Sequence, residues 1–163
     1  MRMPFRKPLI VVAPKKLLKF RGASSSIEDF GETTRFQNLI PDSNKDIVAP
    51  EKVKKVVICS GQVFYDLESA RTKAGRNDIA ILRAESLHPF PFKEIIAQLK
   101  NYKNAELMWA QEEPKNAGAW LYAEPRLRNI REFLKQDEEV SYAGRPIMAA
   151  AAVGYTKTHN TQL

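Results

Sequence analysis

Hydrophobic and polar positions change their period along the chain, most clearly between residues 56 and 70. Val56–Cys59 is a short continuous apolar run, which is typical of a strand that is covered on both faces. Ser60 and Gly61 interrupt this run, and from Val63 the apolar side chains recur at helical spacing. The pattern therefore predicts a strand, a glycine turn and a helix, which together form half of a βαβ unit.

The same rhythm continues toward the C-terminus. Strands are predicted over residues 78–83, 105–110 and 140–144. Helices are predicted over 92–102 and after Gly118, where Pro125 is expected to kink or restart the second one, and residues 111–118 between them read as a polar loop. Strands that alternate with helices of this length predict an α/β fold with three layers: a largely parallel sheet with helices on both faces.

The first fifty residues predict an arm of different character. Residues 9–13 read as a strand, 14–22 as a short helix, 36–40 as another strand, and 42–51 as a surface loop. Ser25–Glu28 matches a helix capping box. We therefore expect a basic arm over residues 1–50 that packs on a main domain over 51–163. Residues 156–163 regain a helix-compatible composition as the chain stops, so the domain is expected to be truncated at its C-terminus.

Composition is that of a folded globular protein, with 44% hydrophobic and 28% charged residues, and no apolar run approaches a membrane span. The net charge of +7 is concentrated in residues 1–21, which hold seven basic residues and no acidic ones. The remaining 19 basic residues (26 minus 7) balance the 19 acidic ones. This balance argues against a general polyanion-binding surface, and no nucleic-acid partner is expected.

Chemically distinctive residues are few. The sequence contains no glycine-rich dinucleotide or phosphate loop, no HExxH, no nucleophile elbow and no paired-cysteine metal site. Cys59 lies inside an apolar strand and is interpreted as a small buried hydrophobe. His88 and His159 are far apart in sequence, and a structural or surface role is expected for each. No catalytic residue is therefore predicted.

Two groups of residues remain as binding candidates. Glu112 and Glu113 follow a strand, where α/β sheets gather binding residues, although the dipole of the next helix would equally favour carboxylates there. Lys15 and Lys16, with Arg6 as a weaker candidate, lie beside the predicted strand-to-helix turn, which suits a phosphate group. A solvated basic face, or contact with another part of a longer chain, explains the basic residues as well.

Several segments together resemble one known family, the C-terminal region of the thiamin-dependent first component of 2-oxoglutarate dehydrogenase. They occur in order over nearly the whole chain and are far more specific as a set than singly. The segments are Arg6–Lys15 with Leu17-Leu18, Cys59–Gly61 with Tyr65–Leu67, Pro89–Pro91, Trp109 with Gln111–Pro114 and Asn116, and Tyr142–Pro146 with Ala152–Tyr155. Two departures are visible: Gln62 stands where the resemblance leads us to expect lysine, and Ala110 where cysteine often follows the tryptophan.

The resemblance implies a transketolase C-terminal-like domain, in agreement with the pattern of strands and helices. It also implies a parent enzyme that decarboxylates 2-oxoglutarate on thiamin diphosphate and magnesium and succinylates the lipoyl group of a partner succinyltransferase. The cofactor motif of such enzymes is absent from this chain, so no cofactor and no catalysis are expected here. The implied location is the mitochondrial matrix in a eukaryote and the cytoplasm in a bacterium.

The roles implied for this region are homodimer assembly and regulation by a nucleotide or acetyl-coenzyme A. The Pro89–Pro91 turn and the alanine-rich tail from Ala149 are apolar segments that a dimer surface would use. Two other interpretations stay open. One is the same domain of a 2-oxoadipate dehydrogenase, and the other is a stand-alone α/β module that binds a nucleotide or another phosphate ligand.

Overall fold

The computed structural model describes residues 4–136, 139–155, 157–158 and 161, and the chain forms two compact units, residues 1–34 and 35–163. Within the described ranges, no helix has the length and hydropathy to cross a membrane. The predicted arm and its packing on the main domain stay predictions. The second unit contains the whole sheet, because its first strand already begins at Leu39.

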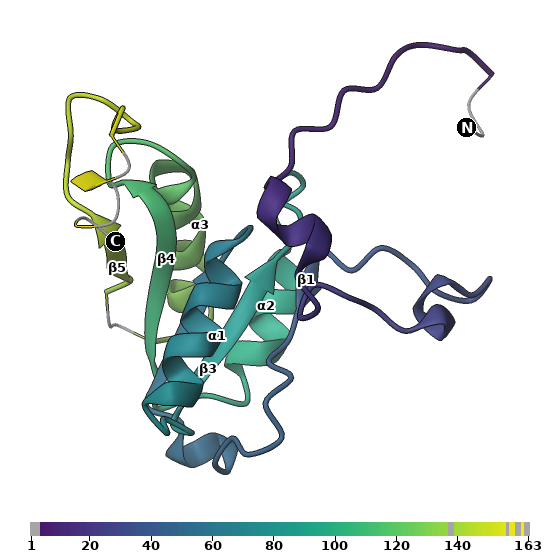
Figure 1. The fold of residues 1–163 in the computed structure, drawn as a ribbon. Coiled ribbons are helices and arrows are strands. Elements are labelled where there is room, and N and C mark those ends of the chain that lie inside the picture. Colours follow the sequence, from purple (N-terminus) through teal and green to yellow (C-terminus); the bar gives the residue numbers. More distant parts are fainter. Residues whose placement is uncertain (1–3, 137–138, 156, 159–160, 162–163) are drawn as a thin grey trace. The chain divides into compact units, whose positions relative to one another are not determined.

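The second unit is built on a five-stranded sheet in the order β1-β3-β2-β4-β5 (Figure 1). The strands β2 to β5 are mutually parallel, and only the two-residue β1 runs antiparallel, beside β3. The bounds are β1 Leu39–Ile40, β2 Lys55–Cys59, β3 Ile79–Ala84, β4 Glu106–Pro114 and β5 Ser141–Arg145. The predicted largely parallel sheet is confirmed.

Helices cover both faces of this sheet, as the sequence predicts (Figure 1). The helix α1 (Val63–Lys73) packs on one face, and α2 (Phe92–Leu99) and α3 (Trp120–Phe133) lie on the other. Alternation along β2 separates the two cores: Val56 and Ile58 face the larger core beneath α2 and α3, and Val57 and Cys59 face α1. A continuous apolar strand is required because both of its faces are buried.

Two predictions about the later elements are wrong. The polar loop predicted from Gln111 instead continues β4 as far as Pro114, because this strand pairs with β5 beyond a register shift. Polar residues are tolerated there since their side chains alternate between the two faces of a strand end. The restart expected at Pro125 does not occur, because α3 is one helix through that residue, whereas a kink there stays a prediction. Proline so close to the helix start removes one backbone hydrogen bond without ending the helix.

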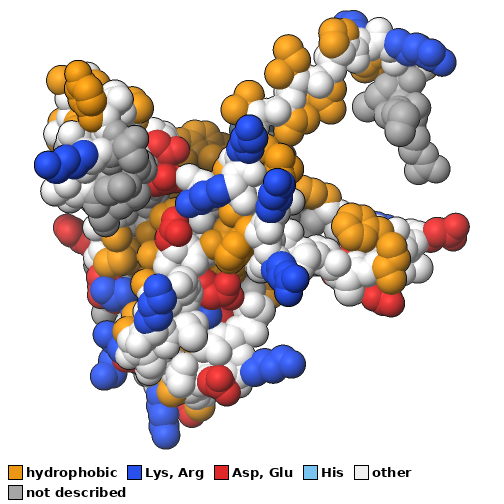
Figure 2. All heavy atoms as spheres, viewed as in Figure 1, with side chains coloured by type: hydrophobic (Ala, Val, Ile, Leu, Met, Phe, Trp, Pro, Cys, Tyr) orange, Lys and Arg blue, Asp and Glu red, His pale blue; other side chains and the backbone are white. Residues whose placement is uncertain are grey.

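The first unit, residues 4–34, has a different structure. It contains two short 3₁₀ helices, Lys15–Lys19 and Ile27–Phe30, and no strand. The strand predicted over residues 9–13 is therefore wrong, and side chains there are 73–95% exposed from Leu9 to Val12. The physical reason is that this apolar run has no neighbouring strand with which to pair. Apolar side chains are exposed along this segment (Figure 2).

The start of the second unit is held by one buried ion pair. Asp42 accepts a hydrogen bond from the Arg71 guanidinium and another, at 2.6 Å, from the backbone amide of Ile81. Both side chains of the ion pair are almost fully buried. The segment predicted as a surface loop is thereby fastened to α1 and β3, and a short 3₁₀ helix, Pro50–Lys52, precedes β2.

The two segments expected to form a dimer surface differ in exposure. In the Pro89–Pro91 turn, Phe90 and Pro91 are buried within the second unit and only Pro89 is exposed. The tail over residues 149–152 is exposed. The turn therefore has an internal packing role, and the tail remains available for contact with another chain.

Candidate functional site

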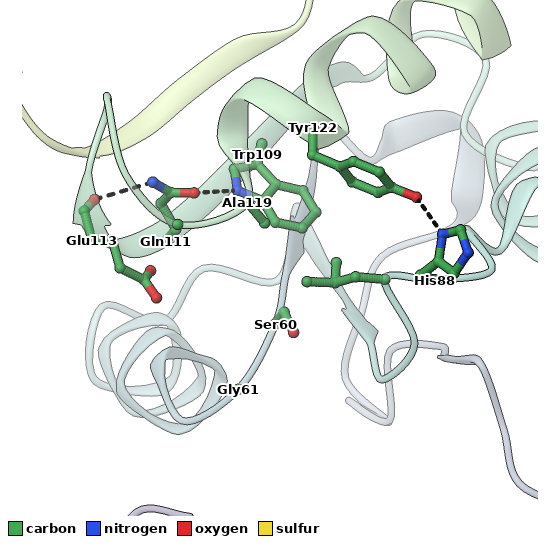
Figure 3. Close-up of a pocket in the computed structure, with 10 residues that line it drawn as sticks. Ser60, Gly61, His88, Trp109, Gln111, Glu113, Ala119 and Tyr122 are labelled. Atoms are coloured by element: carbon green, nitrogen blue, oxygen red, sulfur yellow. Dashed lines mark hydrogen bonds between the residues drawn. The ribbon is translucent and has the colours of Figure 1, made fainter. Parts of the chain in front are cut away.

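A cavity of about 510 Å³ opens at the carboxyl ends of the parallel strands, on the face of the sheet beneath α2 and α3. The fold assembles it from the turn after β2, the connection after β3, the end of β4 and the start of α3 (Figure 3). Open α/β sheets gather ligands at this position. The lining residues are Ser60, Gly61, Leu87, His88, Trp109, Gln111, Glu113, Gly118, Ala119 and Tyr122.

Gln111 is the residue that organises one wall of this cavity. Its side-chain nitrogen shares its two hydrogens among three backbone carbonyls at 2.8–3.2 Å, those of Glu113 and Pro114 at the end of β4 and of Ala117 in the β4–α3 connection. Its side-chain oxygen accepts from the indole nitrogen of Trp109 at 3.0 Å and from the backbone amide of Trp120 at 2.8 Å. The side chain is buried, so this saturated network fixes the end of β4 to the start of α3 (Figure 3).

A glycine makes room for that network. Gly118 has φ 62°, in the left-handed region that favours glycine. A Cβ at this position would lie 3.0 Å from the Gln111 side-chain nitrogen and 3.0 Å from the Cβ of Glu113. Gly118 therefore allows the connection to close over the Gln111 side chain.

The opposite wall is aromatic. The ring of His88 and the hydroxyl of Tyr122 approach to 3.2 Å, and Figure 3 shows both side chains at one end of the cavity. The guanidinium of Arg126 lies 3.5 Å from the centre of the Tyr122 ring, a cation–π contact that holds the ring in place. In the part of the chain that the structure describes, no hydrogen bond joins Ser60 to His88 and no three metal-ligating side chains cluster. An apolar cavity with few polar groups suits ligand recognition.

Comparison with known proteins decides the family. The family described as "2-oxoglutarate dehydrogenase C-terminal" matches residues 24–163. This chain belongs to that family. All residues that line the cavity lie within the matched range.

Relatives of the 2-oxoglutarate dehydrogenase family cover nearly the whole chain. The "2-oxoglutarate dehydrogenase E1 component" of Cupriavidus necator is 43% identical over 97% of this chain and 16% of its own length. "2-oxoglutarate dehydrogenase, mitochondrial" of Schizosaccharomyces pombe is 44% identical over 95% of the chain and 16% of its own length, and the protein of the same name in Caenorhabditis elegans 41% over 96% and 15%. The chain thus spans about a sixth of the length of the curated relatives it matches. The resemblance seen in the sequence is confirmed, and a stand-alone phosphate-binding module is not favoured.

The predicted basic site lies outside the matched family domain. Arg6, Lys15 and Lys16 precede residue 24 and are exposed. Lys15 and Lys16 belong to a five-residue 3₁₀ helix that follows Pro14. The strand that would have positioned this helix is not formed, so the expected strand-to-helix turn is wrong. Binding of phosphate by these residues stays a prediction.

The two candidate carboxylates are separated by the sheet. Glu113 lines the cavity and lies beside Gly118, so binding and helix-dipole interpretations both remain for it. Glu112 faces the side of α1, where its two carboxylate oxygens accept hydrogen bonds from Gln62 at 2.9 and 2.7 Å. The family resemblance led us to expect lysine at the position of Gln62. Glutamine still donates hydrogen bonds to Glu112 but brings no positive charge to it.

Three further residues considered in the sequence are Cys59, His88 and His159. Cys59 is fully buried, and this burial raises the pKa of its thiol to about 12, so the protonated form is inert. His88 is exposed at the edge of the family domain's cavity, and His159 lies outside the described residues. Sequence reasoning missed Trp109, Gln111 and Tyr122 as lining residues. The alternation of Trp109 and Gln111 would have indicated one wall if the strand had been extended past residue 110.

Proposed function

We propose that this chain is the C-terminal domain of the first component of 2-oxoglutarate dehydrogenase (succinyl-transferring). The complete enzyme would oxidatively decarboxylate 2-oxoglutarate and succinylate the lipoyl group of its partner in the tricarboxylic acid cycle. The family match over residues 24–163 carries this proposal, and relatives at 41–44% identity support it. Within that enzyme the domain serves dimer assembly and regulation.

Thiamin diphosphate and magnesium are the cofactors of the proposed enzyme, and they would supply its decarboxylation chemistry. The sequence lacks the motif that holds this pair in the resembling enzymes. We therefore place the cofactors in a region outside this chain. The chain by itself is expected to bind no thiamin diphosphate and to turn over no 2-oxo acid.

A turnover assay of the full-length protein that contains this chain tests the function. Decarboxylation is followed as reduction of an artificial electron acceptor, with thiamin diphosphate and magnesium, on 2-oxoglutarate and on 2-oxoadipate in parallel. Preferential turnover of 2-oxoglutarate supports the proposal, and preference for 2-oxoadipate assigns the chain to the related dehydrogenase. Turnover of neither substrate overturns both. The 163-residue chain, assayed beside it and titrated calorimetrically with cofactor, is the control.

The proposed partners are the rest of the same enzyme, a second copy in a homodimer and a lipoyl-bearing succinyltransferase. Apolar side chains that stay exposed in residues 9–12 and in the tail over 149–152 supply surface for the first two. The eukaryotic relatives are named mitochondrial and the bacterial one is not. We accordingly propose the mitochondrial matrix for a eukaryotic source and the cytoplasm for a bacterial one.

Regulation is proposed through a phosphate-bearing effector, a nucleotide or acetyl-coenzyme A, that contacts Lys15, with Lys16 and Arg6 as weaker contacts. A direct charge-assisted hydrogen bond to phosphate contributes roughly 1.5–3 kcal/mol. Lys15→Ala should therefore weaken effector binding to the full-length enzyme about tenfold or more and leave unregulated turnover unchanged, with Lys52→Ala as the matched control. An equal response of mutant and wild type to the effector would place the site elsewhere.

A further inference from the structure

Arg145, at the end of β5, is buried and forms no ion pair with the residues that the structure describes. Its side chain is 7% exposed, and its Nε donates to the backbone carbonyl of Glu112 at 2.9 Å. Its Nη1 is buried and has no hydrogen-bond partner, and no carboxylate among the described residues forms an ion pair with it. A buried guanidinium in this condition is strongly destabilising. An anion from outside the chain would satisfy it.

The backbone around this arginine is built to hold it in place. The carbonyl oxygen of Arg145 accepts from the hydroxyl of Tyr142 at 2.9 Å and from the amide of Lys115 at 3.0 Å. The preceding Gly144 has φ 156°, and a Cβ there would lie 2.5 Å from the Tyr142 hydroxyl and 2.7 Å from the carbonyl oxygen of Gln111. Only glycine permits so close an approach of β5 to β4. The position of the guanidinium is therefore fixed before any ligand arrives.

Arg145 lines a second cavity, of about 240 Å³, on the opposite face of the sheet from the first. Val63 and Leu67 of α1 line it together with Ala110 and Ala143 of the sheet, and these walls are apolar. The charged residues of its lining are Arg145 and Glu112. The cavity thus combines a fixed cation with a small hydrophobic space.

We propose that this cavity binds a small monocarboxylate, with the carboxylate on the terminal nitrogens of Arg145 and a short apolar body against α1. The planar guanidinium fork matches a carboxylate in geometry and charge. The apolar walls of the cavity suit a short hydrocarbon group beside the guanidinium. This site is separate from the proposed catalytic function and from the predicted effector contact at Lys15.

Glu112 explains why a single negative charge is favoured. Its carboxylate receives its hydrogen bonds from Gln62, a neutral side chain, so its charge is not cancelled by that contact. A phosphate group carries about −1.5 to −2 charges near neutral pH, and its additional charge is attracted by Arg145 and repelled by Glu112 alike. The second charge therefore adds little net attraction and increases the cost of removing the ligand from water, so a monocarboxylate is favoured.

Titration of the 163-residue chain with sodium butyrate at constant ionic strength tests the proposal. Binding is measured by calorimetry and by the NMR signals of the arginine Nε–H groups, with 1-butanol and inorganic phosphate as comparison ligands. Saturable butyrate binding that shifts one arginine signal, and that is at least tenfold tighter than binding of butanol or phosphate, is expected. Equal binding of butyrate and butanol, tighter binding of phosphate, or no saturable binding overturns the proposal.

Two variants locate the site. Arg145→Gln should weaken butyrate binding at least tenfold, whereas Arg76→Gln, which changes an exposed arginine paired with Asp78, should not. Ala143→Val keeps the Arg145 guanidinium and fills part of the cavity with a side chain that is common in strands, so it should also weaken butyrate binding. This second variant tests the site if the Arg145→Gln chain does not fold. Unchanged affinity in a folded Arg145→Gln chain, or in Ala143→Val, refutes the assignment.

Discussion

Replacing Gln111 with leucine should destabilise the second unit more than an average core mutation. Leucine has a similar size and cannot form hydrogen bonds, so Gln111→Leu leaves the Trp109 indole and the Trp120 amide as buried donors without an acceptor. Three carbonyls, two at the end of β4 and one in the β4–α3 connection, lose their donor at the same time. Each buried donor left unpaired costs about 1–3 kcal/mol, so a loss of roughly 3–5 kcal/mol is expected. Typical domains have only about 5–15 kcal/mol of stability.

Urea denaturation followed by tryptophan fluorescence measures this change, because both tryptophans of the chain contact Gln111. The matched control is Gln98→Leu in α2, where glutamine forms no side-chain hydrogen bond within the described part of the chain. Its free energy of unfolding should change by less than about 0.5 kcal/mol. If Gln111→Leu costs less than about 1 kcal/mol, water replaces these bonds and the reasoning about the cavity wall is wrong.

Three further changes test other parts of the second unit. Burial raises the pKa of Cys59 to about 12 from 9.0, so as the pH rises the thiol loses its proton in the unfolded chain before it does in the folded one. The contribution of Cys59 to stability should be complete below pH 9 and fall between pH 9 and 12. Urea midpoints at about pH 8 and 10.5 measure this fall, which should be smaller in Cys59→Ala. Asp42→Ala leaves the buried charge of Arg71 without its ion-pair partner and should lower the free energy of unfolding by about 3–5 kcal/mol. Replacing both residues with apolar ones should restore most of this loss, and thermal unfolding of the two variants compares them. Gly118→Ala places a Cβ 3.0 Å from the cavity network in a left-handed conformation and should cost about 1–2 kcal/mol in urea unfolding, while Gly154→Ala, with open space around it, should cost less than 0.5 kcal/mol.

The sequence was sufficient to predict the sheet because its strands are buried on both faces. Val56–Cys59 had no alternative period to follow, and this run became β2, a parallel strand between β3 and β4. The same rule failed for residues 9–13, which are equally apolar but have no partner strand in their unit. Local pattern therefore predicts the tendency to form a strand, and pairing decides whether the strand forms.

The candidate site could not be predicted in the same way, since it depends on residues that look unremarkable in sequence. Gln111 reads as the start of a polar loop, and only the continuation of β4 buries it beneath α3. Arg145 follows the strand predicted over residues 140–144, and its burial follows from the extension of β5 to this residue and the close approach of Gly144 to β4. Both depend on pairing between β4 and β5, which are separated by the whole of α3.

The greater length of β4 is the common origin of both cavities. The strand β2 ends at Cys59, which pairs with Ala110, whereas β4 continues for four more residues and pairs there with β5. Beyond Ala110, one edge of β4 therefore has no neighbouring strand, and only the turn at Ser60 and Gly61 borders the space beside it. Since side chains alternate along a strand, Gln111 must face one side of this space and Glu112 the other. A change that shortened β4 would consequently be expected to remove both cavities together, whereas a change at a residue that lines one of them, such as Tyr122 or Ala143, should affect that cavity alone.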